Sequence, residues 1–490
     1  MAETASQPGS GGELTDTSSL GAASSSKAAE GDPPRASPRP TRISRSLLRS
    51  LVAVLVGSLI LRLAAQTMGQ MLQSYFDEIH HHHHLLPYSA RGFIIATFFI
   101  AELIGSIVLG AMSDRYGRKR FIMLGPLFGA VAVQITSMTV AIPLLILTRL
   151  LEGLSTASAI PATLGYISDV TKGHPNLRAR VMGLFEITLV GGIAMGAVAG
   201  GYLWKYFGKP VTAGSLHLIS PAFCLNGLIY LLSLAVFVWG LRPMRRSIDE
   251  SQAPLHVAPS ASAHPTLSHY RQIMKSPAIW SFVPAWLAIF SIIGMWGNHA
   301  VGLLTGSDHY RNQVLMGAFG TATFGNGFAI LAAVFAAGVL GWSLLMGRYR
   351  KTSVMLIATG GLALTLIAVS GINHLSAFSG PIYYPLLALL GVGVLLLSGF
   401  TPAALTYLAD VTEGFTQDRG SIMGLYSVFL GVGQLVGITT GGFFADWNGV
   451  NGLIVLSAIF GVITLLSLVA LHRREPSVAA QRILQTASGA

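Results

Sequence analysis

The stretch GAMSDRYGRKR, residues 110–120, follows one long apolar run, precedes another and carries the strongest information about the fold. It places Asp114, Arg115 and Arg118 directly after about 20 mostly apolar residues, the length that a helix needs to cross a lipid bilayer. At such a helix end, Asp114 can be held by backbone N–H groups of a nearby helix start and by Arg115 or Arg118. The pattern predicts a charged latch at a membrane surface.

Glycines and further basic residues complete this stretch. Gly110 and Gly117 permit close packing and a tight turn. Lys119 and Arg120 have a simpler interpretation, because a basic cluster next to a membrane helix can serve only to set the orientation of the chain.

The composition agrees with a membrane environment. Of the 490 residues, 52% are hydrophobic and only 10% are charged, whereas soluble domains carry roughly 25% charged residues. Most side chains must therefore face lipid or one another. The net charge of +11 does not indicate a nucleic-acid partner, because the basic residues lie in short stretches between apolar runs. The single cysteine, Cys224, can form no intrachain disulfide.

Twelve apolar runs predict an all-α membrane protein with twelve transmembrane helices. They are continuous and too long for the strands of a membrane barrel. We expect a disordered cytoplasmic tail at 1–46, six-helix bundles at 47–241 and 277–472, a cytoplasmic linker at 242–276, and a second tail at 473–490. The runs begin near residues 47, 90, 120, 143, 181, 217, 278, 317, 353, 382, 420 and 450.

The lysines and arginines predict the orientation. Most of those next to the helices fall on one side of the membrane, which by the positive-inside rule is the cytoplasm. Both termini are then cytoplasmic in a multi-pass protein of the plasma (inner) membrane. The other side holds Arg91, Lys205, Lys209 and Arg311.

The two halves resemble each other. An offset of 241 residues aligns helices four and five with helices ten and eleven without a gap. Such repeats place a substrate path between the halves. The matching pairs include Pro161 and Pro402, Tyr166 and Tyr407, Asp169 and Asp410, Thr171 and Thr412, Arg178 and Arg419, and Gly192 and Gly433.

The loop motif and the duplicated twelve helices resemble the major facilitator superfamily, whose signature at this loop is G-x-x-x-D-R-x-G-R-[RK]. The resemblance implies that Asp114, Arg115, Gly117 and Arg118 lock the cytoplasmic side closed in the outward-open state. Asp169, at the end of helix four, matches the acidic partner commonly found there. The equivalent loop of the second half reads LLMGRYRKT around Met346 and has no aspartate at the matching place.

Helix five carries glycines at a regular spacing, which lets helices approach closely or slide. The spacing resembles the antiporter signature of the drug/proton branch of the superfamily, with Ala197 where that motif has proline. Ordinary tight packing is the alternative, and it gains weight because helix eleven has the same spacing. The glycines are Gly183, Gly192, Gly196, Gly200 and Gly201.

Ionisable residues inside predicted helices are costly and usually functional. Arg149 and Glu152 lie one turn apart on helix four, where Leu145, Arg149 and Gly153 are similar to a motif of proton-linked members of the superfamily. The further candidates for proton coupling or the central cavity are Arg62, Glu102 and Glu186. A static ion pair or a pore-facing hydrogen bond is the alternative for each acid, and an anionic substrate is one for Arg62.

The second half has almost no charge within its predicted helices, so its part of a cavity is expected to be polar or aromatic. An asymmetric, mainly apolar cavity suits lipophilic or amphipathic cargo. Each residue alone is more often a packing residue than a substrate contact. The candidates are Trp296, Asn298, His299, Asn326 and Gln434.

Five consecutive histidines follow Asp77 and Glu78, in the predicted outer loop between helices one and two. Imidazoles bind zinc, nickel or copper, but a run of histidines in a loop lacks fixed geometry. We therefore expect no metal site. The run comprises His80, His81, His82, His83 and His84.

Phosphate-binding loops and catalytic motifs are absent from the sequence, so neither an enzyme, nor ATP drive, nor a cofactor is expected. The leading hypothesis is a monomeric, proton-coupled exporter of small lipophilic or amphipathic compounds, working by alternating access in the lipid bilayer. The alternatives are coupled or facilitated uptake of a metabolite, and a membrane sensor that does not transport.

Overall fold

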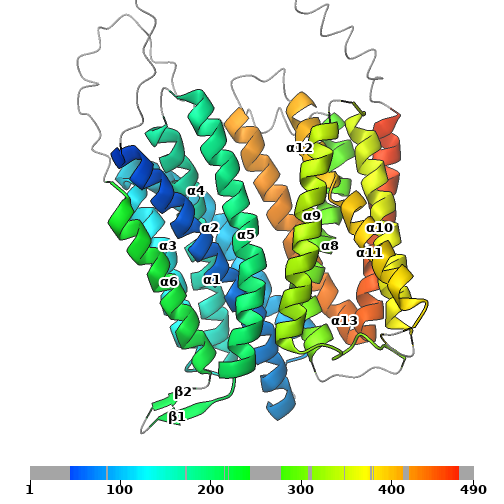
Figure 1. Ribbon diagram of the computed structural model, residues 1–490, viewed down its shortest axis with the longest axis horizontal. Helices are drawn as coiled ribbons and strands as arrows, with labels where there is room; N and C mark the ends of the chain where they lie inside the picture. The colour runs from blue at the N-terminus through cyan, green and yellow to red at the C-terminus, as the bar shows by residue number, and fades with distance from the viewer. Residues whose placement is uncertain are drawn as a thin grey trace, which may run out of the picture. The chain divides into compact units, whose positions relative to one another are not determined.

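The computed structural model describes residues 45–83, 86–171, 174–213, 216–218, 220–242, 277–306, 312–346, 348–375, 378, 380–411 and 419–473. Almost all of these residues are helical, and strands within them are limited to one short hairpin (Figure 1). The all-α membrane fold class is correct. The predicted tails at 1–46 and 473–490 and the linker at 242–276 lie almost entirely outside the described residues.

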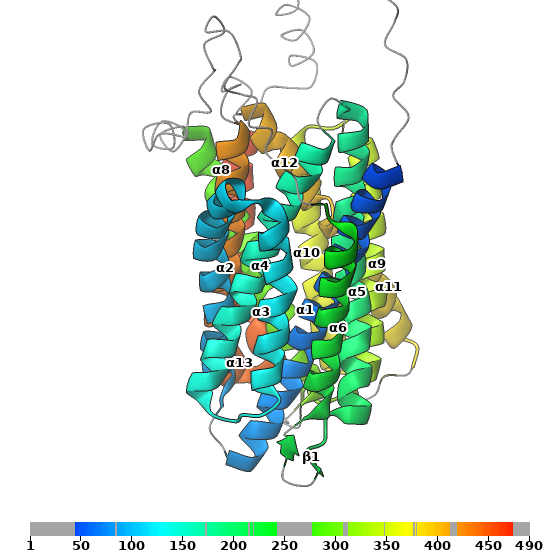
Figure 2. The same ribbon diagram turned by 90° about the vertical axis from the view of Figure 1, so that its left-hand side faces the viewer.

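The first half of the chain packs around its own core, in which Phe76, Phe223 and Tyr230 are fully buried. Helix α1 contacts α5 and α6, while α4 packs against α2 and α3. Both views show α1 running obliquely through this half (Figure 1 and Figure 2). Its elements are α1 (Arg45–His83), α2 (Tyr88–Tyr116), α3 (Arg118–Thr136), α4 (Ile142–Val170), α5 (Pro175–Phe207), β1 (Val211–Ala213), β2 (Leu216–Leu218) and α6 (Pro221–Gly240).

The second half has its own apolar clusters, one of which contains the buried side chains of Trp286, Phe290 and Phe400. Helix α13 packs along α8, and α10 packs against α11 and α13. The elements are α8 (Pro277–Thr305), α9 (Thr321–Leu345), α10 (Lys351–Asn373), α11 (Tyr383–Leu397), α12 (Phe400–Val411) and α13 (Arg419–His472).

The number of membrane-spanning helices is consistent with the predicted twelve. Ten helices in the described part of the chain are long and apolar enough to cross a bilayer. One of them lies in α13, which non-helical dihedral angles at Asn448 and Gly449 divide into two helices. Helix α3, with 19 residues and Pro126 inside it, is not among the ten.

Local sequence signals explain where several helices begin and end. Helices α4, α5 and α6 each have a proline in the first turn, where its missing N–H is not needed by the helix. Gly117 separates α2 from α3 with a φ of 102°, a backbone conformation that glycine adopts without a steric penalty. This turn brings Arg118 back beside the end of α2.

Several helix starts were predicted a few residues off, such as helix five, which begins at Pro175 and not near 181, and two further boundaries were wrong. Helix α1 continues to His83, so His80–His83 belong to a helix and not to the predicted loop, because no proline or glycine lies between Gln70 and Leu86. Helix six, predicted to begin near residue 217, begins at Pro221, since Leu216–Leu218 pairs with Val211–Ala213 as an antiparallel strand. Neither change alters the order of the helices.

The two ends of the helical bundle need separate names. The hairpin end is where α2 begins, α5 ends and the β1–β2 hairpin lies (Figure 1). The motif end is where α2 ends at Tyr116 and α5 begins at Pro175.

Candidate functional site

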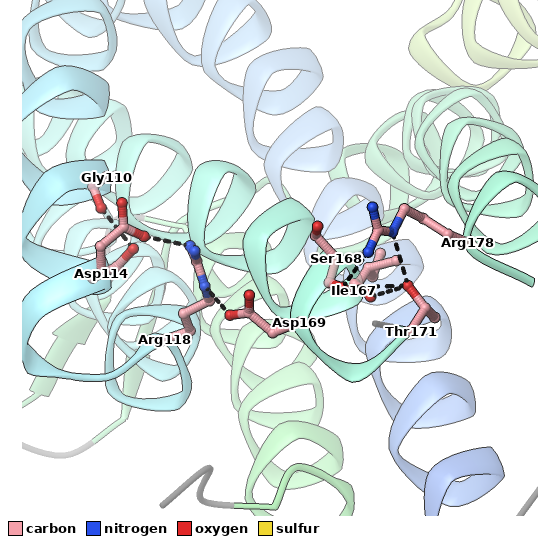
Figure 3. A network of polar contacts seen from close by, with 9 residues as sticks. Gly110, Asp114, Arg118, Ile167, Ser168, Asp169, Thr171 and Arg178 are labelled. Atoms are coloured by element: carbon pink, nitrogen blue, oxygen red, sulfur yellow. Dashed lines mark hydrogen bonds and ion pairs between the residues drawn. The ribbon is translucent and has the colours of Figure 1, made fainter. Parts of the chain in front are cut away.

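The charged loop motif forms an ion-pair network at the motif end (Figure 3). The Nη1 atom of Arg118 lies 2.6 Å from Oδ1 of Asp114, and its Nε atom donates to Oδ2 of Asp169 at 2.6 Å. Arg118 therefore joins the end of α2 to the end of α4. The Asp114 side chain is 60% exposed, so it retains acceptor capacity for a further donor.

The other residues of the motif support this network less directly. Arg115 lies over the ring of Tyr116, with its Cζ atom 5.6 Å from the ring centroid. A β-carbon at Gly110 would lie 3.5 Å from Pro161 on α4, an ordinary packing distance. Arg178 on α5 donates to the carbonyl of Ser168 at 3.1 Å (Figure 3), so a second arginine fastens the end of α4.

Arg149 and Glu152 form a buried ion pair on α4. The Nη2 atom of Arg149 donates to Oε1 of Glu152, and each side chain is at most 5% exposed. The ion pair that was the alternative to proton coupling for Glu152 is therefore present in the structure. Taking two charges out of water is costly, so a pair at this depth is weak evidence for stability alone.

A second charged group surrounds Arg62 on α1. Its Nε atom is buried and, in the described part of the protein, has no hydrogen-bond partner. The positive charge of Arg62 acts on the carboxyl groups of both Glu102 on α2 and Glu186 on α5. Glu102 is half-buried and Glu186 is exposed. The sequence left the counter-charge of Arg62 unassigned, and the acids within range of its charge include Glu102 and Glu186.

Tyr230 on α6 lies within range of both charged groups and was not predicted. Its ring is buried, and the charges of Arg62, Arg149 and Glu152 all act on its hydroxyl. The ring fills the space beside Gly129 on α3, where a β-carbon would collide with it. In the sequence Tyr230 is one aromatic residue in an apolar run, so only the three-dimensional packing reveals its position.

A pocket opens beside Arg62, between α1, α4 and α5. Its empty volume is about 370 Å³, which includes open solvent. Its walls combine the Arg62 side chain with hydroxyl groups and apolar side chains. The hydroxyl residues were not predicted, because serines and threonines inside helices are common. They are Ser58, Ser155, Thr156 and Thr163.

Four of the polar candidates of the second half contact other residues of that half. Trp296 donates to Ser457 at 2.8 Å, and Asn298 donates to the carbonyl of Gly294 at 2.8 Å. The buried His299 is 2.8 Å from the carbonyl of Ile438 through its Nε2 atom. The backbone of Gln434 packs against Gly294. None of these four residues lines the pocket.

The helix-five glycines serve packing against two different helices. A β-carbon at Gly192, Gly196 or Gly200 would lie between 2.5 and 2.8 Å from atoms of α1. Gly201 instead packs against the backbone of Thr321, the first residue of α9 in the other half. At Gly183 nothing lies within 4 Å. The same arrangement recurs in the second half, where Gly433, Gly437 and Gly441 pack on α8 and Gly442 packs on the start of α2.

The hydrogen bonds that join the two halves, as far as the described residues show, lie at the hairpin end. The carboxylate of Asp446 on α13 accepts from the backbone N–H groups of Tyr88 at 2.6 Å and Ser89 at 2.9 Å. On the opposite side, Thr321 donates to the carbonyl of Gly201 at 3.0 Å. Asn326 on α9 donates to the hydroxyl of Tyr202 at 3.3 Å, so this candidate joins the halves.

Arg91 is a buried residue at the hairpin end. From the sequence it was predicted to lie outside the membrane, near the start of helix two. Arg91 belongs to α2, its side chain is fully buried, and its Nη2 atom lies 3.3 Å from Oδ1 of Asp77 on α1. It also donates to the carbonyl of Leu86 at 2.9 Å, and its Cζ atom lies 4.4 Å from the centre of the Tyr88 ring. Charge counting along a sequence could not distinguish this buried arginine from a loop residue.

The described residues contain no group of three or more His, Cys, Asp or Glu side chains arranged to hold a metal ion. Of the histidine run, His80 is half-buried on α1. The side chains of His81–His83, and His84 entirely, lie outside the described part of the protein.

The comparisons with known proteins cover most of the chain. A family model described as Major Facilitator Superfamily matches residues 50–397 and 312–487. The chain is 25% identical over 364 residues to Multidrug resistance protein 2 of Bacillus subtilis (strain 168), covering 74% of this chain and 81% of that protein. It is 27% identical over 374 residues to the class C Tetracycline resistance protein of Escherichia coli, covering 75% and 84%.

The solved structures show the same fold. The crystal structure of the nucleoside transporter NupG matches with a TM-score of 0.63, covering 88% of this chain and 99% of that chain. The sequence identity in this match is 11%, so the likeness concerns the arrangement of helices alone.

Proposed function

Because the chain belongs to the major facilitator superfamily, we propose that it is a proton-coupled exporter of small lipophilic or amphipathic compounds. The multidrug and tetracycline resistance proteins among its relatives support export over uptake. The two halves would rock about the pocket beside Arg62, opening it first to one side of the membrane and then to the other.

The observation that carries this proposal is the composition of the charged cluster. The cluster contains two guanidinium groups, of Arg62 and Arg149, and three carboxyl groups, of Glu102, Glu152 and Glu186. An unbalanced charge is costly inside a membrane protein, and binding of one proton makes the cluster neutral. A cationic or hydrogen-bonding solute in the pocket would compete with that proton. Such competition is the requirement for exchange of a solute against protons.

We propose that the motif end faces the cytoplasm and that the Asp114–Arg118–Asp169 network is its latch. Arg118 holds Asp114 at the end of α2, where an exposed carboxylate oxygen can accept N–H groups at the start of a helix from the other half. The hairpin end offers a precedent, because Asp446 binds the start of α2 in this way. Both termini would then be cytoplasmic, in a plasma-membrane monomer.

Coupled or facilitated uptake of a metabolite is the second candidate, favoured by the hydroxyl groups around the pocket. A sensor without transport would leave the charged residues permanently paired. The Nε atom of Arg62 has no hydrogen-bond partner in the described structure, which argues against a sensor.

The proposal is tested with purified protein in liposomes that enclose a pH-sensitive dye. Addition of tetracycline or of the lipophilic cation ethidium should move protons across the membrane in the direction opposite to the solute. Glu152→Gln should reduce this proton movement at least about tenfold, since one titratable group of the cluster is lost. Glu78→Gln, the same change at an exposed position on α1, is the matched control and should leave the signal unchanged.

The outcomes separate the candidates. Proton movement in the same direction as the solute would support uptake by symport in place of export. If neither solute moves protons and Glu152→Gln transports as the wild type does, the assignment of the cluster to coupling is wrong.

A further inference from the structure

Gly165 on α4 lies directly under the guanidinium group of Arg118. A β-carbon at this position would lie 2.7 Å from the Nε atom of Arg118 and closer still to its Cζ and Nη1 atoms. Real β-carbons essentially never approach other heavy atoms so closely. The guanidinium group therefore occupies space that exists only because residue 165 has no side chain.

The same guanidinium group holds both carboxylates of the network from this position. Nη1 contacts Asp114 and Nε contacts Asp169, each at 2.6 Å, so two different edges of the planar group are in use. Asp169 lies four residues after Gly165 and hence on the same face of α4. The guanidinium group reaches both carboxylates because it lies against the backbone of α4.

The internal repeat provides a comparison within the same chain. The position that matches Gly165 at the offset of 241 residues is Thr406, whose hydroxyl donates to the carbonyl of Pro402 at 2.7 Å. In the corresponding loop of that half, Arg350 donates to the carbonyl of His472 at 2.8 Å, so it binds the end of α13. The half that has a side chain at this position also lacks the aspartate of the motif.

We propose that Gly165 is a positioning residue of the transport cycle. Because it has no side chain, the guanidinium group of Arg118 can bind both Asp114 and Asp169, and this determines the strength of the latch at the motif end. The proposal rests on the latch role given above to Asp114, Arg118 and Asp169. Addition of a methyl group at residue 165 displaces the guanidinium group and leaves the fold intact, because the atoms it meets are the mobile end of a long side chain.

A double-mutant cycle distinguishes seating of Arg118 from ordinary helix packing. Gly165→Ala, Arg118→Ala and the double variant are made in a background with Cys224→Ser. Spin labels at Arg180 on α5 and Leu344 on α9, both exposed near the motif end, report the open and closed populations of that end by distance measurement. Gly360→Ala on α10 is the matched control, since nothing lies within 4 Å of its added methyl group.

Gly165→Ala should raise the ratio of open to closed motif end by roughly fivefold, the size expected when two partly exposed ion pairs are lost. The double variant should match Arg118→Ala alone within twofold, because the added methyl group has nothing left to displace. Gly360→Ala should behave as the parent protein.

Three results would overturn the proposal. The first is an open-to-closed ratio in Gly165→Ala equal to that of the wild type. The second is a double variant in which the effects of the two substitutions multiply. The third is failure of both Gly165→Ala and the double variant to fold. The last result would assign Gly165 to helix packing. The measurement needs no solute, so failure of the proposed export activity is detected separately.

Discussion

At the scale of single residues, Arg62 is the side chain on which the charged cluster depends. It lines the pocket, its Nε atom is buried without a described partner, and its charge acts on Glu102 and Glu186. Coupling between two ligands of one protein typically changes an affinity by roughly 5- to 150-fold. We expect Arg62→Ala to reduce the effect of pH on solute binding by at least about fivefold, because Glu102 and Glu186 then lack their counter-charge.

Binding titrations of the purified protein at several pH values measure this effect. Arg62→Lys keeps the positive charge and should retain most of the pH effect, although a lysine loses the planar geometry of the guanidinium group. A pH dependence in Arg62→Ala equal to that of the wild type would show that Glu102 and Glu186 are not involved in coupling.

At the scale of the secondary-structure elements, α2 obtains its N-terminal cap from the other half of the chain. Its own capping residue, Pro87, supplies no side-chain hydrogen bond, whereas the carboxylate of Asp446 accepts from Tyr88 and Ser89. A negative charge at a helix N-terminus also interacts favourably with the helix dipole. The cap forms only while α2 and α13 are together, so it stabilises the closed hairpin end.

Asp446→Ala should therefore open the hairpin end. Loss of an N-cap costs about 1 kcal/mol, which corresponds to a roughly fivefold change in the ratio of open to closed states. Distance measurements between labels on α2 and α13 give this ratio. Lys205→Ala, at the position that matches Asp446 in the repeat, is the control and should leave the ratio unchanged. An unchanged ratio in Asp446→Ala would mean that apolar packing alone closes this end.

At the scale of the whole molecule, the helical architecture was predictable because it depends on patterns along the chain. The length of the apolar runs predicts helices, and the repeat predicts two related halves, as the matched packing of Gly192 on α1 and Gly433 on α8 illustrates. The motif also located Asp114, Arg118 and Asp169 correctly as neighbours.

Features that depend on contacts between distant segments were not predictable. Tyr230 packs at Gly129 and Asp446 caps α2, so both features result from packing of residues far apart in sequence, and neither has a local pattern. The β1–β2 hairpin was missed because three-residue strands beside a long apolar run give no separate signal.

On both sides of the molecule, the hairpin end closes by packing of a glycine against a carbonyl oxygen of a helix backbone. A β-carbon at Gly92 on α2 would lie 2.7 Å from the carbonyl oxygen of Ile438, and one at Gly325 on α9 would lie 2.5 Å from that of Ala197. Ile438 and Ala197 are 241 residues apart, so they occupy matching positions of the repeat. The obstructing atoms belong to helix backbone and cannot rotate away.

Gly92→Ala and Gly325→Ala should therefore each hinder closure of the hairpin end while leaving both halves folded. Overpacking in a tight interface costs about 1–3 kcal/mol, so we expect a shift of roughly tenfold towards the open state.

Gly327→Ala on the same helix α9 adds its methyl group where nothing lies within 4 Å, and it should keep the distribution of the parent. Labels on α5 and α9 near Tyr202 and Asn326 measure the separation. A closed hairpin end in Gly92→Ala and Gly325→Ala alike would show that the two halves do not close on these glycines.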